Sequence, residues 1–156
     1  MSRLHVLRAV SGAGKSTRAK ELVQEWIDKH TPFGGEGDVV GITESMTLVC
    51  STDDFFVARG GRYEFDAKKL SEAHAWNRGR VRAAMELGIG LVVVDNTNTR
   101  RWEYQPYLDM ATQFGYETEE EIVGKFDEAS LKVYANRNRH GVPLEAIRKM
   151  AARFQK

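Results

Sequence analysis

The sequence predicts an α/β fold in which a mostly parallel sheet carries helices on both of its faces. Short apolar runs alternate along the chain with longer segments whose apolar residues recur at helical spacing, and this alternation is typical of βαβ units. The run at residues 91–94 is continuously apolar and rich in β-branched residues, as expected of a strand buried on both faces. We therefore expect one domain over residues 1–156, a length sufficient for its own hydrophobic core.

Composition and charge exclude several classes of protein. The formal net charge is +1, so the chain is no polycation, and any binding of nucleic acid must rest on a local group of basic residues. Cys50 is the only cysteine, which excludes an internal disulfide and favours a reducing, cytoplasmic location. The sequence has no apolar run near 18 residues and no leader pattern, so we expect no membrane association.

A glycine-bearing turn joins the first predicted strand, residues 3–10, to a helix from about Lys15 to Lys29. The turn reads Ala-Val-Ser-Gly-Ala-Gly-Lys-Ser-Thr over residues 9–17, which is the context of a phosphate-binding P-loop, although the full pattern has glycine in place of Ala9. Glycines let backbone N–H groups converge on one point, and the helix N-terminus adds positive potential there. We expect ATP and Mg²⁺ as cofactors, with Lys15 on the β- and γ-phosphates and Ser16 on the metal ion. The residues predicted to hold the nucleotide are Ser11, Gly12, Ala13, Gly14, Lys15, Ser16 and Thr17.

Acidic and amide side chains follow the next two predicted strands, where ligands bind in open α/β sheets. Asp53 and Asp54 follow the strand at residues 46–50, and side-chain alternation predicts that only one of them faces the phosphates. A carboxylate in this position can accept a proton from an attacking hydroxyl group. The alternative is that both aspartates only cap the turn that follows the strand. Asp95 ends the apolar run in a Walker-B-like position, where its carboxylate can hold Mg²⁺. The alternative is that Asp95 only forms an Asx-turn that starts the next helix. The residues predicted to bind the acceptor are Asp53, Asp54, His74, Asn77, Asn96 and Asn98.

The middle of the chain predicts two helices and an edge strand. The first helix runs from about residue 67 to Leu87, with Asp66 as its N-cap. His74 and Asn77 share an apolar face of this helix, so they either line the site or find hydrogen-bond partners within the core. The second helix spans residues 101–114, and acidic residues at 116–123 favour an edge strand. The core contacts predicted for the second helix are Trp102, Tyr107, Met110, Ala111 and Phe114.

Two segments depart from the regular alternation. Residues 30–46 predict an insertion loop, either a surface insertion or a flap, because residues 30–38 hold one proline and three glycines. Within this loop, residues 39–42 form a short strand or hairpin arm. Residues 126–143 predict a helical lid, in which Arg137 and Arg139 next to a Gly-Val-Pro break stabilise a transferring phosphoryl group. The alternative is an ordinary helix end with cations that suit its dipole.

Taken in order, six stretches resemble the P-loop polynucleotide 5′-hydroxyl kinases. The resemblance is closest to the polynucleotide-kinase-like AAA-type ATPase domains of ubiquitin-ligase-binding proteins and of phage and bacterial predicted kinases, and it covers nearly the whole chain apart from the insertion. The stretches are Gly-x-Gly-Lys-Ser-Thr (12–17), Ser-Thr-Asp-Asp-Phe-Phe (51–56), Ala-His-x-Trp-Asn (73–77), Val-Asp-Asn-Thr-Asn (94–98), Glu-x-x-Pro-Tyr (103–107) and Arg-Asn-x-His-Gly-Val-Pro (137–143).

This resemblance implies a P-loop NTPase kinase fold with a helical lid and transfer of the γ-phosphate of ATP to a 5′-hydroxyl of DNA or RNA, with Mg²⁺, as in nucleic acid end repair. It implies that Asp53 is the base and that Arg137 is the lid arginine. Phage-type members often have an arginine three positions after the aspartate, on the acceptor's phosphate, where this chain has Phe56. The chain has no Asp-x-Asp-x-Thr phosphatase motif, so we do not expect a bifunctional enzyme.

Two other functions agree with the same residues. The near-neutral net charge keeps open a kinase for a small molecule such as a nucleoside, a sugar nucleotide or an antibiotic, since one fold hosts many reactions. The other alternative function is a non-catalytic ATP-binding module, in which the nucleotide orders the lid for a partner protein. The sequence leaves the choice between DNA and RNA and the oligomeric state open.

Overall fold

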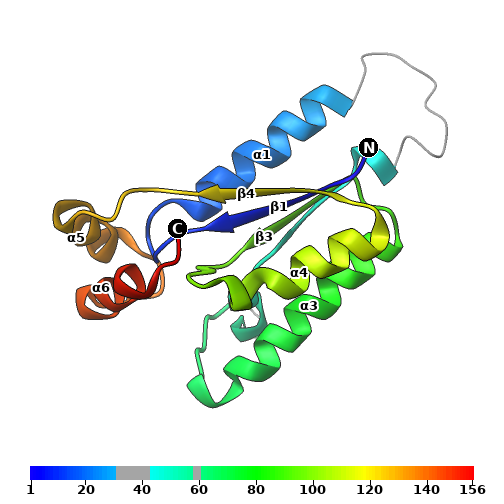
Figure 1. Cartoon of the computed structure of the whole chain (residues 1–156). Helices are drawn as coiled ribbons and strands as arrows, with labels where there is room; N and C mark the ends of the chain where they lie inside the picture. The colour runs from blue at the N-terminus through cyan, green and yellow to red at the C-terminus, as the bar shows by residue number, and fades with distance from the viewer. Residues whose placement is uncertain (31–42, 58–60) are drawn as a thin grey trace.

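The computed structural model describes residues 1–30, 43–57 and 61–156 and contains a four-stranded parallel sheet (Figure 1). The strand order is β2-β3-β1-β4, and all three pairings are parallel. The strands are β1 (Arg3–Arg8), β2 (Thr47–Cys50), β3 (Leu91–Asp95) and β4 (Glu117–Ile122). The predicted α/β fold is thus confirmed, with β1 inside the sheet and every residue of β3 buried.

Helices cover both faces of this sheet. Figure 1 shows α1 on one face, α3 and α4 on the other, and α5 with α6 beside the carboxyl ends of the strands. Two short 3₁₀ helices, η1 and η2, lie between β2 and α3. The helices are α1 (Lys15–His30), η1 (Thr52–Phe56), η2 (Ala67–Lys69), α3 (Leu70–Glu86), α4 (Arg101–Phe114), α5 (Glu128–Arg137) and α6 (Leu144–Arg153).

The helix boundaries follow local signals in the sequence. Asp66 accepts a hydrogen bond from the backbone N of Lys68 (3.0 Å), so the predicted cap begins η2, which leads directly into α3. The Asp127 side chain caps α5 in the same way, by accepting from the backbone N of Ser130 (3.1 Å). Gly115 ends α4 in the left-handed region with φ 73°, where glycine carries no Cβ penalty.

Apolar clusters on the two faces of the sheet hold the layers together. Ala19, Leu22 and Trp26 of α1 pack over β1 and β3, as their spacing predicts. The cluster on the opposite face joins α3 and α4 to the sheet and includes Val81 and Tyr107, both fully buried. Each fully buried large side chain of this kind contributes about 1.5–3 kcal/mol relative to an exposed one.

The structure differs from the expectations for Trp102 and for part of the predicted insertion. Trp102 is 70% exposed, because the first turn of α4 borders the cleft described below rather than the sheet, so it is no core residue. In the predicted insertion, residues 43–45 are helical, and the backbone O of Glu44 accepts a hydrogen bond from Trp26 Nε1 (2.8 Å). Residues 31–42, with the expected strand or hairpin arm at 39–42, lie outside the described residues.

The predicted edge position of the acidic strand is confirmed, because β4 pairs with β1 alone among the strands described. Its side chains are mostly exposed, and arginines from neighbouring elements pair with its carboxylates. Arg3 lies 3.5 Å from Glu119, and Arg101 lies 3.1 Å from Glu120. Within the described parts of the chain, no helix has the length and apolar character needed to cross a membrane.

Arg18 links α1 to β4 and makes stability depend on pH. Its Nε donates a hydrogen bond to Glu121 (2.8 Å), which holds the pKa of that carboxyl below its ordinary value of 4.5. A lowered folded-state pKa stabilises the fold above pH 4.5 and ceases to do so as the pH falls through the lowered value. We therefore expect Arg18→Gln to reduce the free energy of unfolding at about pH 7 and to have a progressively smaller effect as the pH falls below 4.5. Urea unfolding at about pH 7 and at a series of lower pH values tests this, and a reduction that is the same at every pH would contradict it.

Candidate active site

The P-loop connects β1 to α1 and has the backbone shape that its glycines permit. Gly12 has φ 81° and Gly14 has φ 107°, conformations that other residues rarely adopt. The helix α1 begins at Lys15, so its free N–H groups and positive dipole end lie at this turn. The loop therefore has the local structure of a polyphosphate site.

Asp95 lies beside the P-loop because β3 runs next to β1 in parallel register, with Leu7 opposite Asp95. The Ser16 hydroxyl donates a hydrogen bond to Asp95 Oδ2 (3.2 Å). Two oxygen donors side by side next to a phosphate site fit Mg²⁺, which binds one or two protein oxygens and takes its other ligands from phosphates and water. When bound, Mg²⁺ would neutralise charge on the β- and γ-phosphates.

The ionisable groups of this site require charged partners. Burial lowers the pKa of Lys15, against the attraction of Asp95 and Asp53, and burial raises the pKa of Asp95, against the attraction of Lys15. Loss of hydration thus disfavours both charges. An anionic phosphate chain next to Lys15 and a cation next to Asp95 would each favour the ionised form, which agrees with the predicted cofactors.

The acidic pair after β2 lies on a 3₁₀ turn, not on a strand, which corrects the argument from side-chain alternation. The two carboxylates still point to different neighbours, since successive residues of a 3₁₀ helix are about a third of a turn apart. Asp53 Oδ1 accepts a hydrogen bond from the Tyr63 hydroxyl (3.3 Å), and its Oδ2 lies 3.6 Å from His140 Nε2. Asp54 instead pairs with Arg80 of α3 (3.1 Å).

Tyr63 and His140 were not recognised from the sequence, and together they fix the surroundings of Asp53. Their rings stack with centroids 3.9 Å apart. Burial and the neighbouring Asp53 raise the pKa of Tyr63 to about 12, so its hydroxyl stays protonated and can donate. His140 lies within the Arg-rich stretch already quoted, whereas no sequence signal marks Tyr63.

The segment predicted as a lid packs against the P-loop. Arg137 Nε donates a hydrogen bond to the backbone O of Gly12 (2.8 Å). An apolar cluster joins α5 and α6 to the loop and includes Ala13, Leu131 and Ile147. Arg139 is exposed and lines the same cleft as the P-loop.

Gly12 permits this close approach. A Cβ at Gly12 would lie 2.5 Å from the backbone O of Tyr134, whereas a Cβ at Gly115, also at positive φ, would meet nothing within 4 Å. We expect Gly115→Ala to cost about 1–2 kcal/mol of backbone strain. Gly12→Ala should cost more and should also weaken ATP binding by about tenfold, which corresponds to about 1.4 kcal/mol. Urea unfolding and ATP titration of both variants test this, and equal losses in the two would contradict it.

Five of the six residues predicted to bind the acceptor line one cleft, and Asn77 lies away from it. Asp53, Asp54, His74 and Asn96 line a cleft of about 1750 Å³ that also contains the P-loop. His74 Nδ1 lies 3.3 Å from Thr52 Oγ1, and Asn96 Oδ1 accepts from the backbone N of Thr52 (2.8 Å). These bonds hold the end of β2 against α3 and β3.

Asn77 lies away from the cleft, which corrects its placement at the acceptor, whereas Asn98 lines the cleft and also has a structural role. Asn77 is fully buried, does not line the cleft, and donates to the Tyr107 hydroxyl (3.0 Å). Asn98 borders the cleft but is 2% exposed, and its amide donates to the backbone O of Leu7 (2.8 Å). Its φ of 45° and a hydrogen bond from Arg8 Nε to its backbone O (2.9 Å) fix the turn after β3.

Phe56 replaces the arginine that phage-type kinases often carry and does not reach the cleft. Its side chain is 5% exposed and packs against Phe65 (centroids 5.0 Å apart) and Tyr63. Any contact with an acceptor phosphate must therefore come from another element.

The fold is that of the P-loop kinases, and the glycine-bearing loop lies in a cleft at the carboxyl edge of the parallel sheet. The chain matches the AAA_33 family, described as an AAA domain, over residues 4–156 and belongs to that family. The predicted resemblance is therefore confirmed at the level of a P-loop kinase-like domain.

One curated relative and two solved structures illustrate the similarity. The chain is 35% identical to NEDD4-binding protein 2 of Homo sapiens across 98% of its own length, but it spans only 8% of that protein. A chain of the Pnkp1/Rnl/Hen1 RNA repair complex has a TM-score of 0.66 at 15% identity, covering 98% of this chain and 44% of that one. A gluconokinase from Sinorhizobium meliloti 1021 has a TM-score of 0.57 at 13% identity, covering 99% and 75%. At such identities the two structures establish the fold alone.

Proposed function

We propose that the protein is a kinase that transfers the γ-phosphate of ATP to the 5′-hydroxyl of a polynucleotide. The observation that carries this proposal is the shared cleft, in which Asp53 faces the same cavity as the P-loop and the lid arginines. In this arrangement Lys15 and the loop N–H groups hold the phosphates, and Ser16 and Asp95 hold Mg²⁺.

Asp53 then acts on the acceptor. Its carboxylate accepts the proton of the 5′-hydroxyl as the oxygen bonds to the γ-phosphorus, and ADP leaves with the electrons of the broken P–O bond. Arg137 and Arg139 stabilise the charge on the phosphoryl oxygens during transfer. The order of the six motifs supports a nucleic acid as acceptor, as does the RNA repair complex to which one structural neighbour belongs.

A small-molecule acceptor is the second candidate, and the buried Phe56 favours it. The cleft then lacks the arginine that phage-type kinases place on an acceptor phosphate, and gluconokinase shares the fold. Near-neutral net charge agrees with either candidate, because single contacts to phosphate require only local cations.

A transfer assay separates the two candidates. The protein is incubated with Mg²⁺ and γ-labelled ATP and is offered a 5′-hydroxyl oligonucleotide, the same oligonucleotide with a 5′-phosphate, and a mixture of nucleosides and sugars. We expect label on the 5′-hydroxyl oligonucleotide and none on its blocked control. Label on a nucleoside or sugar alone would overturn the proposal in favour of the small-molecule kinase. ATP hydrolysis without labelled acceptor would favour a nucleotide-binding module.

A further inference from the structure

We propose that a single-stranded acceptor leaves the active-site cleft along the groove between α3 and α4, with Arg78 and Arg82 on its phosphates and Trp102 under one of its bases. The proposal rests on the proposed function and specifies how the acceptor is held in place of the arginine absent at Phe56. It assigns binding roles to three residues outside the motif set.

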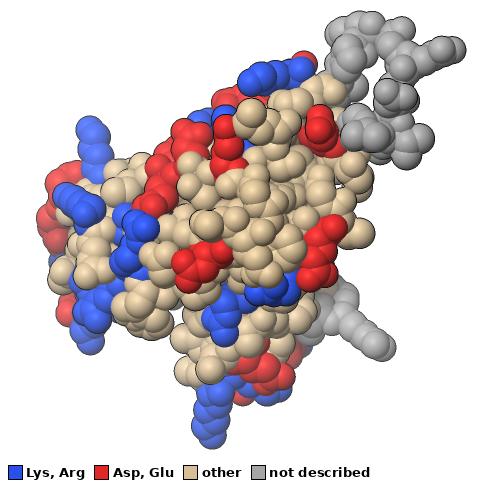
Figure 2. Space-filling model, turned by 45° about the vertical axis from the view of Figure 1, so that its right-hand side comes forward, with Lys and Arg blue, Asp and Glu red and all other residues tan. Residues whose placement is uncertain are grey.

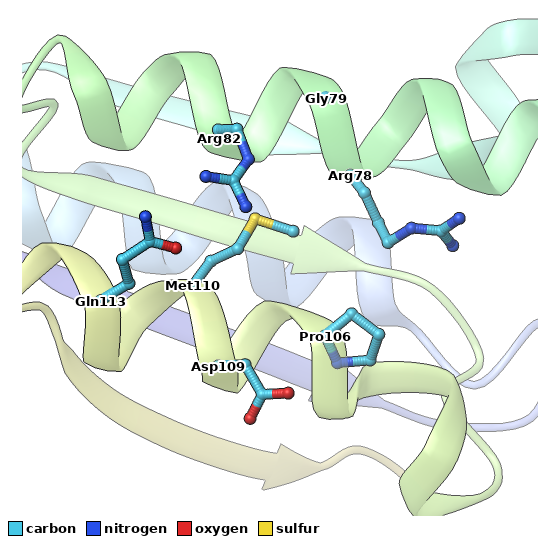
Figure 3. Close-up of a pocket in the computed structure, with 7 residues that line it drawn as sticks. All are labelled: Arg78, Gly79, Arg82, Pro106, Asp109, Met110 and Gln113. Carbon is cyan, nitrogen blue, oxygen red and sulfur yellow. The ribbon is translucent and has the colours of Figure 1, made fainter.

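The groove is continuous with the active-site cleft. A second cavity of about 390 Å³ lies between α3 and α4, and Figure 3 shows the residues that line it. Arg78 and Pro106 line both this cavity and the cleft that holds the P-loop. In Figure 3, Arg82 projects toward α4 over Met110, and Arg78 extends past the tip of the β3 arrow, toward the carboxyl edge of the sheet. A chain that leaves the cleft on this side enters the groove directly.

The two arginines of the groove are free to bind an anionic ligand. Arg78 and Arg82 are four residues apart on α3, so their side chains share a face of the helix, with Cβ atoms about 5–6 Å apart. Within the described residues neither forms an ion pair, whereas Arg80 between them is paired with Asp54 (3.1 Å). Figure 2 shows basic and acidic side chains interspersed over the visible surface.

The acidic side chain in the groove is already engaged. Asp109 lies on the α4 wall, and its Oδ1 accepts a hydrogen bond from Gln105 Nε2 (2.8 Å). The Arg82 guanidinium lies 5.6 Å from the centroid of the Phe114 ring, which orients it without neutralising it. The two arginines therefore outnumber the acid in the groove and suit a phosphate chain.

Trp102 supplies an aromatic surface where the groove meets the cleft. It is 70% exposed and lines the cleft together with Arg78 and Pro106. An exposed indole at a binding site is informative, because most large aromatic side chains are buried. Stacking of one base on such a ring contributes about 1–3 kcal/mol to binding and does not depend on the nucleotide sequence. Cations that follow the phosphates and an aromatic platform for a base are the usual combination for single strands.

Acceptor length provides the test, because a groove outside the cleft matters only to an acceptor long enough to enter it. KM is measured for a 5′-hydroxyl dinucleotide and for a 5′-hydroxyl strand of about twelve nucleotides, within the range of single-strand site sizes. The variants are Arg78→Gln with Arg82→Gln, and Trp102→Leu alone. The control pair, Lys29→Gln with Lys132→Gln, removes the same charge from exposed positions on α1 and α5.

For the wild-type protein and the control pair, we expect KM to be about tenfold lower for the long strand than for the dinucleotide. In the arginine double variant this ratio should fall to about one, because the groove no longer holds the phosphates of the strand. The slope of log KM for the long strand against log salt should then decrease by about 1.4, or about 0.7 for each phosphate that is no longer neutralised. Trp102→Leu should lower the length ratio without changing the salt slope.

Two results would overturn the inference, and they differ. If the wild type labels oligonucleotides but the arginine double variant keeps the length ratio and the salt slope, the strand does not follow this groove and the proposed function stands. If the wild type labels nucleosides or sugars and no oligonucleotide, the proposed function fails and the groove assignment fails with it.

Discussion

Replacing Asp53 with asparagine should lower kcat for transfer to a 5′-hydroxyl by about 10²–10⁴-fold, the range typical of the loss of a general base. Asparagine keeps the shape of the side chain and can still contact Tyr63 and His140, but it cannot take the proton. KM for ATP should change little, because the nucleotide is held by the P-loop. The measurement is steady-state transfer of labelled phosphate, with circular dichroism to establish that the fold is intact.

Asp54→Asn is the matched control for this prediction. It removes the neighbouring carboxylate, which pairs with Arg80 rather than with the lid. We expect a loss of less than about tenfold, as for an exposed ion pair of small energy. A larger loss from Asp54→Asn than from Asp53→Asn would show that the base is the second aspartate.

Lys15→Met should lower kcat by about 10²–10³-fold, comparable to the removal of one group that stabilises the transition-state charge. Methionine has nearly the same length and no charge, so the β- and γ-phosphates lose their cation. The same variant should leave the thermal unfolding temperature unchanged or slightly raised, since burial lowers the pKa of Lys15 and its charge is costly when no phosphate is bound.

Lys29→Met on the same helix gives the control, because it makes the same substitution at an exposed position in the last turn of α1. Both kcat and KM should equal the wild-type values. If Lys15→Met retained wild-type kcat while ATP bound normally, the P-loop would bind the nucleotide without taking part in transfer.

Much of the fold and the phosphate end of the site could be predicted, because each depends on local patterns. The glycine turn before Lys15 forces its own backbone shape, and a parallel sheet then brings Asp95 next to it. The acidic run at 117–121 predicted an edge strand, since carboxylates there have solvent on one side.

The acceptor end was harder to predict because its residues come from distant segments. Periodicity gave the face of α3 that holds His74 and Asn77, but it could not say that one borders the cleft and the other contacts Tyr107. Trp102 fits the helical pattern of a core residue, and only the position of α4 at the cleft exposes it. Tyr63 approaches Asp53 from a loop without a motif.

The acidic edge strand has a consequence for behaviour in concentrated solution. An edge strand leaves backbone N–H and C=O groups free to pair with a strand of another molecule, which is a common route to aggregation. Along β4 the carboxylates of Glu117, Glu119, Glu120 and Glu121 would lie close to the same acidic run of the other molecule, and like charges directly opposite are unfavourable. This like-charge repulsion along β4 should weaken as acid neutralises the carboxylates.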